Sequence, residues 1–240
     1  MPTSREIRLA ARPQGVPKDS DFELAEAEVP DPGEGKVLVR NSYLSVDPYM
    51  RSRMNDMKSY IPPFQVGEPL QGGAVGQVIA SRNPEFEEGE WVQGLLGWRE
   101  LYTSDGNGLF RVDPALAPVS TALGVLGMPG LTAYTGLIHI GQPAEGETVY
   151  VSAAAGAVGS TVGQMAKLKG CRAVGSAGSQ EKVSWLVDEL GFDAAFNYKE
   201  RDFGGATLHV VFGIRGPHVD VLPRNVESLQ AASLRAAAGV

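Results

Sequence analysis

A chain of 240 residues can form one large domain or two smaller ones, each with its own hydrophobic core. Hydrophobic residues make up 43% and charged residues 20%, as in ordinary globular proteins, and a formal net charge of -7 gives no reason to expect nucleic-acid binding. The single cysteine, Cys171, excludes an internal disulfide and a cysteine-built zinc site. We expect a cytoplasmic protein, and no apolar run is long enough for a membrane span.

The first half of the chain predicts a β-rich domain, which we place at residues 1–120. Short alternating runs are separated there by turn residues. Strands are expected at residues 36–40, 74–79 and 91–94. The turn sequences DPGEG and EGE stand directly before the first and the third of these strands.

From about residue 120 the pattern changes to helices and strands in alternation. Helices are expected at residues 120–126, 132–140, 160–169 and 181–190, and strands at residues 148–152, 172–176 and 194–197. Gly170 and Gly191 stand where two of these helices should end. This order is typical of an α/β domain with a doubly wound parallel sheet, which we place at residues 121–205.

A small-residue turn, AAGAVG at residues 154–159, joins the first of these strands to a helix. Its spacing is that of the dinucleotide fingerprint, with alanine in place of the first glycine. Gly156 would let the backbone approach a pyrophosphate, and Gly159 would let the helix pack close to the strand. A plain strand–helix turn is the alternative, but the flanking strand, helix and second strand favour dinucleotide binding.

The absence of acidic residues indicates which dinucleotide is bound. An NAD site needs a carboxylate at the end of the second strand, to bind the ribose 2′-hydroxyl. Between Ser160 and Gln180 there is neither Asp nor Glu, and Lys182 follows. A 2′-phosphate suits such surroundings, so NADP(H) is the predicted cofactor. Lys182 could instead be a solvated lysine paired with Glu181 or Asp188.

The histidines, His139, His209 and His218, are scattered, and with one cysteine they predict no metal site. The best candidate for substrate chemistry is Tyr49, in the sequence LSVDPYMR at residues 44–51. Its hydroxyl could donate a hydrogen bond to a developing enolate. Packing of the ring over nearby methionines is an equally good explanation.

Several segments together resemble the zinc-independent medium-chain dehydrogenase/reductases, in the branch of the prostaglandin, alkenal and curcumin reductases. They are SVDPYMR at residues 45–51, GEPLQGGAVGQV at 67–78, LGMPGLTAYTGL at 126–137, AAAGAVGSTVGQMAKLKGC at 153–171 and GSQEKVSWLVDELGFDAAFNYK at 178–199. The resemblance implies a GroES-like catalytic domain followed by a Rossmann domain. It also implies NADPH-dependent reduction of the C=C bond of α,β-unsaturated ketones or aldehydes, small-molecule substrates.

The resemblance further implies a role for particular residues. Tyr49 would border the substrate, Met128 and Thr132 would lie near the nicotinamide, and Lys182 and Tyr198 would contact the 2′-phosphate end of the cofactor. The pyrophosphate would be held by Gly156, Ala157, Val158 and Gly159. A homodimer is compatible with the resemblance but is disfavoured for so short a chain.

Residues 206–240 depart from the pattern of this family. They contain a candidate strand at residues 209–212 and a candidate helix at residues 226–238, and neither matches the family. We therefore expect a partial Rossmann domain followed by a tail that does not belong to the family. Two alternatives to an enone reductase stay open: an NADPH quinone reductase, and a shortened, non-catalytic chain that binds NADPH.

Overall fold

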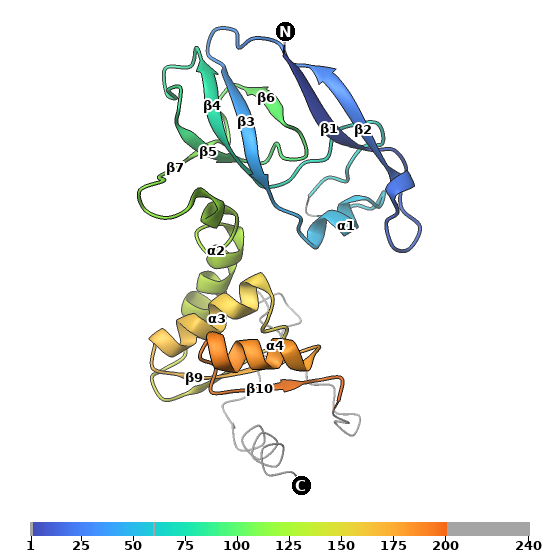
Figure 1. Ribbon diagram of the computed structural model, residues 1–240. Coiled ribbons are helices and arrows are strands. Elements are labelled where there is room, and N and C mark those ends of the chain that lie inside the picture. Colours follow the sequence, from blue (N-terminus) through green and yellow to red (C-terminus); the bar gives the residue numbers. More distant parts are fainter. Residues whose placement is uncertain (1, 60, 201–240) are drawn as a thin grey trace. The chain divides into compact units, whose positions relative to one another are not determined.

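The computed structural model describes residues 2–59 and 61–200, which divide into two compact units (Figure 1). The first unit is Met1–Gly127, and the second begins at Met128. The expectations for residues 206–240, with His209 and His218, lie outside the described residues.

The first unit is built from antiparallel strands. β1 (Thr3–Leu9) pairs with β2 (Phe22–Glu28), and a five-stranded sheet has the order β6-β3-β4-β5-β7. The strands of this larger sheet are β3 (Val37–Leu44), β4 (Ala74–Ser81), β5 (Trp91–Gly94), β6 (Leu101–Ser104) and β7 (Phe110–Val112). The prediction of a β-rich first half is confirmed, and the three expected strands are β3, β4 and β5.

Helical segments of the first unit are short. They are η1 (Asp19–Asp21), α1 (Tyr49–Arg53) and η2 (Val119–Leu123). The prediction of an α-helix at residues 120–126 is wrong, because the segment there is the short 3₁₀ helix η2. Pro118 precedes it, and Gly124, with φ -122° and ψ -114°, takes the chain out of helical geometry.

The second unit is a parallel α/β unit whose described strands have the order β10-β9-β8. Its elements are α2 (Met128–Tyr134), η3 (Thr135–Gly141), β8 (Thr148–Val151), α3 (Ala157–Leu168), β9 (Arg172–Ala177), α4 (Gln180–Ser184), η4 (Trp185–Glu189) and β10 (Ala194–Asn197). Strand order 3-2-1 is that of one half of a doubly wound dinucleotide-binding fold. Within residues 128–200, β8 is therefore an edge strand.

Two helices of this unit differ from the prediction. The helix expected from residue 132 begins at Met128, because Pro129 lies in the first turn, where a missing N–H costs nothing. It continues as the π-helix η3, and α4 continues in the same way as η4. Gly170 and Gly191 have φ of 74° and 71° and follow the ends of helical segments, as expected.

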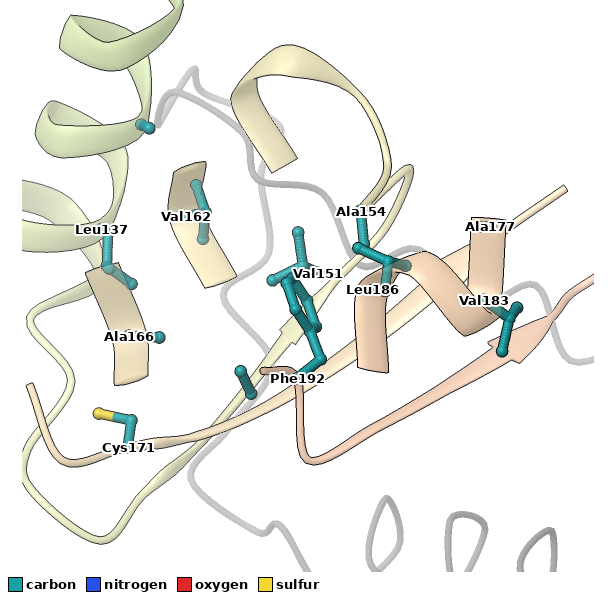
Figure 2. Packing of buried hydrophobic residues seen from close by; sticks show 12 residues of the cluster. Leu137, Val151, Ala154, Val162, Ala166, Cys171, Ala177, Val183, Leu186 and Phe192 are labelled. Atoms are coloured by element: carbon teal, nitrogen blue, oxygen red, sulfur yellow. The ribbon is translucent and has the colours of Figure 1, made fainter. Parts of the chain in front are cut away.

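The core of the second unit lies between the helices and the sheet (Figure 2). Phe192, which is 3% exposed, comes from the loop before β10 and lies against two glycines. A Cβ atom on Gly163 of α3 would overlap the Phe192 ring, and one on Gly175 of β9 would lie 3.0 Å from Cε1 of that ring. The ring thus fills the space that these two glycines leave between α3 and β9.

Candidate functional site

The turn between β8 and α3 is tied to the neighbouring strand. Ala153 adopts a left-handed conformation with φ 48°, and its carbonyl accepts a hydrogen bond from Gly156 N–H at 2.9 Å. The Ala154 N–H donates to the carbonyl of Ser176 in β9 at 2.9 Å. A left-handed conformation costs energy for any residue with a Cβ atom. These hydrogen bonds hold the Ala153 backbone in that conformation.

Gly159 fits the dinucleotide fingerprint for a steric reason. A Cβ atom there would lie 2.6 Å from the Ala153 carbonyl oxygen and 2.8 Å from the Ala154 Cα atom. Only glycine permits α3 to approach the turn so closely. α3 has 12 residues, starts after Gly156 and has no acidic residue in its first turn. Its first N–H groups lack intrahelical partners and carry positive partial charge, which suits a pyrophosphate.

The carboxyl end of β9 carries small, uncharged residues. β9 ends at Ala177, and Gly178 and Ser179 follow it before α4 begins. The Ser179 hydroxyl caps α4 by accepting a hydrogen bond from Lys182 N–H at 3.4 Å. Tyr198 N–H donates to the Ala177 carbonyl at 3.2 Å, which continues the pairing of β9 with β10. The structure thus brings Tyr198 beside the acid-free end of β9.

Lys182 is exposed on α4. It lines a surface hollow of ≈ 510 Å³ together with Ala155 of the glycine turn and the acidic residues Glu181, Asp188 and Glu189. Within residues 128–200, no ion pair joins Lys182 to Glu181 or Asp188. The pairing considered as an alternative is therefore not formed among these residues.

Tyr150 of the edge strand β8 contacts residues of both β9 and β10. Its hydroxyl donates a hydrogen bond to the Ser176 hydroxyl at 2.8 Å, and its ring stacks on Phe196 with 6.0 Å between centroids. Burial raises the pKa of the Tyr150 hydroxyl, and the hydrogen bond to Ser176 opposes part of that rise. The hydroxyl therefore stays neutral and donates to Ser176 of β9.

Met128 and Thr132 lie one turn apart on α2, and both are exposed. The Thr132 hydroxyl donates to the Met128 carbonyl at 2.7 Å. Both side chains are therefore accessible on α2, and their place beside the nicotinamide is a proposal.

Tyr49 is the first residue of α1 and is partly buried. Its ring packs against a buried cluster that includes Met50 and Met54, as the packing explanation expected. The ring therefore has a structural role, and the catalytic role of its hydroxyl is a proposal.

Other polar candidates show no built catalytic or metal centre in the described part of the chain. His139 is exposed on η3 and makes an edge contact with Tyr134, with 5.3 Å between ring centroids. Cys171 is buried, and burial raises the pKa of its thiol, so it is a small core residue. Among residues 2–59 and 61–200, no His, Cys, Asp and Glu residues gather in a way that could hold a metal. In the same ranges no helix is long and apolar enough to cross a bilayer.

Two residues of this region were not predicted as site residues: Asn197, the last residue of β10, and Lys199, in the turn after it. Asn197 is buried, and its side chain fixes the turn that carries Lys199 next to Gly178. Their position depends on the pairing of β10 with β9, which a sequence pattern alone does not supply.

Comparison with known proteins agrees with this architecture. Residues 5–112 match a family described as the N-terminal domain of oxidoreductase. The NADPH-dependent curcumin reductase of Escherichia coli is 50% identical over 195 residues, which are 81% of this chain and 56% of that protein. The NADP(+)-dependent 2-alkenal reductase of Nicotiana tabacum is 45% identical over 216 residues, 88% of this chain and 63% of the relative. The chain thus spans 56% and 63% of the lengths of these two relatives, less than two thirds of either.

A crystal structure of CurA from Vibrio vulnificus in complex with NADPH is also similar, with a TM-score of 0.78 and 50% sequence identity. The match covers 83% of this chain and 59% of the CurA chain. The β-rich unit, the parallel sheet with its glycine turn and these similarities define a medium-chain dehydrogenase/reductase of the zinc-independent type. Within that family the chain belongs to the branch of the prostaglandin, alkenal and curcumin reductases.

Proposed function

We propose that this chain binds NADPH and uses it to reduce the C=C bond of an α,β-unsaturated ketone or aldehyde. The observation that carries the proposal is the turn around Gly159, where the backbone leaves no room for a side chain. The acid-free end of β9 beside it favours a 2′-phosphate over a free 2′-hydroxyl. The named activities of the curcumin and 2-alkenal reductases support the substrate class.

The residues have the following roles in this proposal. The pyrophosphate lies against Gly156, Ala157, Val158 and Gly159 at the start of α3. Lys182 and Tyr198 contact the 2′-phosphate end, and Met128 and Thr132 border the nicotinamide. The substrate is a small molecule, and a buried, unpaired Cys171 agrees with a cytoplasmic location.

The bound NADPH supplies a hydride to the β-carbon of the enone. Negative charge then develops on the carbonyl oxygen, and a hydrogen-bond donor directed at that oxygen lowers the barrier. Tyr49 is the proposed donor. Its ring packs against the cluster around Met50, which fixes its position, and the residue is only partly buried. A proton added at the α-carbon completes the reduction.

The function is tested by mixing the purified chain with NADPH and a panel of 2-alkenals, enones and quinones, and following the loss of NADPH absorbance. We expect turnover of enones with formation of the saturated product. Turnover of quinones alone would favour a quinone reductase. Binding of NADPH without turnover of any substrate would support the non-catalytic alternative.

Replacing Lys182 with alanine should weaken NADPH binding by about 1–3 kcal/mol, because a charge-assisted hydrogen bond to the 2′-phosphate is lost. NADH binding should change little, since NADH has no such phosphate. Titration of both nucleotides by calorimetry measures the difference. Lys169→Ala, at the opposite end of α3, is the matched control. Equal losses of NADPH and NADH affinity would contradict the assignment.

Replacing Tyr49 with phenylalanine should lower kcat/KM for enones by about tenfold to a thousandfold, because one donor to the developing enolate is removed. The ring that packs against Met50 is kept, so the fold and NADPH affinity should be preserved. Steady-state kinetics and an NADPH titration of the same preparation check both parts. Unchanged kcat/KM across several enones would leave Tyr49 with the packing role alone.

A further inference from the structure

We propose that Lys199, positioned by Asn197, is a second cationic contact for the 2′-phosphate of NADPH and a determinant of cofactor specificity. The proposal deepens the function given above and rests on it. It concerns a lysine that comes from the turn after β10, whereas Lys182 comes from α4.

The first step is the turn that fixes the backbone of Lys199. Asn197 is the last residue of β10, pairs with Ala177 of β9 and is only 7% exposed. Its Oδ1 atom accepts a hydrogen bond from Lys199 N–H at 3.1 Å, and its Nδ2 atom donates to Glu200 Oε1 at 2.5 Å. Because the strand pairing and these two hydrogen bonds hold the turn, Lys199 leaves the sheet in a defined direction.

The second step is the position of the ammonium group. A Cβ atom built on Gly178 would lie 3.5 Å from Lys199 Nζ and 3.1 Å from the Tyr198 hydroxyl oxygen. The Lys199 ammonium group and the Tyr198 hydroxyl group therefore both lie close to the Gly178 backbone at the end of β9. Both groups can donate hydrogen bonds to phosphate oxygens. In dinucleotide-binding folds, the end of this strand is where the ribose 2′ position is recognised.

The third step is the charge of the surroundings. Lys182 shares its hollow with Glu181, Asp188 and Glu189, which offset its positive charge. Glu200 follows Lys199 in the chain, and its carboxylate accepts a hydrogen bond from the Asn197 amide. A dianionic phosphate beside Gly178 would therefore be bound more favourably by two lysines from separate elements than by Lys182 alone.

The test compares nucleotides that differ only in the 2′-phosphate. Lys199→Gln removes the charge and keeps most of the length of the side chain, Lys199→Arg keeps the charge, and Lys169→Gln is a control at the other end of the sheet. NADPH, NADH, adenosine 2′,5′-bisphosphate and 5′-AMP are titrated into each protein by calorimetry. We expect Lys199→Gln to weaken NADPH and the bisphosphate by about tenfold, with NADH and 5′-AMP within about twofold of the wild type. Lys199→Arg should restore most of the loss.

A wild type that prefers NADPH, together with an unaffected Lys199→Gln variant, would overturn this inference and leave the proposed function in place. A wild type that binds NADPH no more tightly than NADH would overturn the proposed cofactor and this inference with it.

Asn197 has a test of its own. Asn197→Ala should lower the ratio of NADPH to NADH affinity in the wild-type background and leave it unchanged in the Lys199→Gln background. A purely structural role would lower both affinities in both backgrounds, and that result would remove Asn197 from the proposal.

Discussion

Replacing Phe192 with alanine is expected to lower the free energy of unfolding by about 3–5 kcal/mol, as for other large-to-small changes in a core. Phe192 is 3% exposed, and its ring fills the space left by Gly163 of α3 and Gly175 of β9. Gly163 and Gly175 have no side chains, so neither contributes side-chain atoms to fill the cavity that the alanine would leave. Denaturant unfolding followed by circular dichroism measures the change.

The same contact predicts a non-additive pair of variants. Gly163→Ala alone should be destabilising by about 1–3 kcal/mol, because the new methyl group overlaps the Phe192 ring. In the Phe192→Ala background the methyl group enters the cavity instead, so the added cost should vanish or change sign. Gln164→Ala, one residue along the same helix and exposed, is the control. Additive losses in the double variant would contradict this account of the packing.

Replacing Gly159 with valine is expected to weaken NADPH binding by at least about a hundredfold. The new Cβ atom would come within 2.6 Å of the Ala153 carbonyl oxygen, so α3 must move away from the turn. The N–H groups of its first turn then no longer converge on the pyrophosphate, and overpacking adds about 1–3 kcal/mol of destabilisation. Titration with NADPH at a temperature where the variant is folded separates the two effects.

Gln164→Val serves as the matched control for this prediction. It introduces the same β-branched residue into α3, but at an exposed position. We expect that variant to bind NADPH like the wild type. Normal NADPH affinity in Gly159→Val would mean that the turn does not hold the pyrophosphate, and the proposed function would lose its main support.

Secondary-structure elements could be predicted from the sequence where they depend only on residues close together in the chain. The strands at residues 91–94 and 194–197 have the expected bounds, because each is a short β-forming run set off by turn residues or glycine. Helix starts were less accurate: the helix expected from residue 132 begins at Met128, with Pro129 in its first turn. The passage from α-helix to π-helix after Tyr134 leaves no comparable mark in the sequence.

The candidate site likewise has one part that the sequence predicts and one part that it does not. The turn around Gly156 and Gly159 could be predicted, because its spacing reflects a steric requirement within a few residues. Lys199 could not, since its closeness to Gly178 depends on the register that pairs Asn197 with Ala177. Contacts between strands depend on pairing register, and a single sequence does not state which residues face each other.

The position of Phe192 has a consequence for the order of events during synthesis. The glycine turn, α3 and β9 all leave the ribosome before Phe192, yet that ring fills the gap between α3 and β9. Until it emerges, the ring that packs between Gly163 of α3 and Gly175 of β9 is missing from this core. A nascent chain stopped before residue 192 should therefore not bind the cofactor, whereas one that extends through β10 contains both the Phe192 ring and the pairing of β10 with β9.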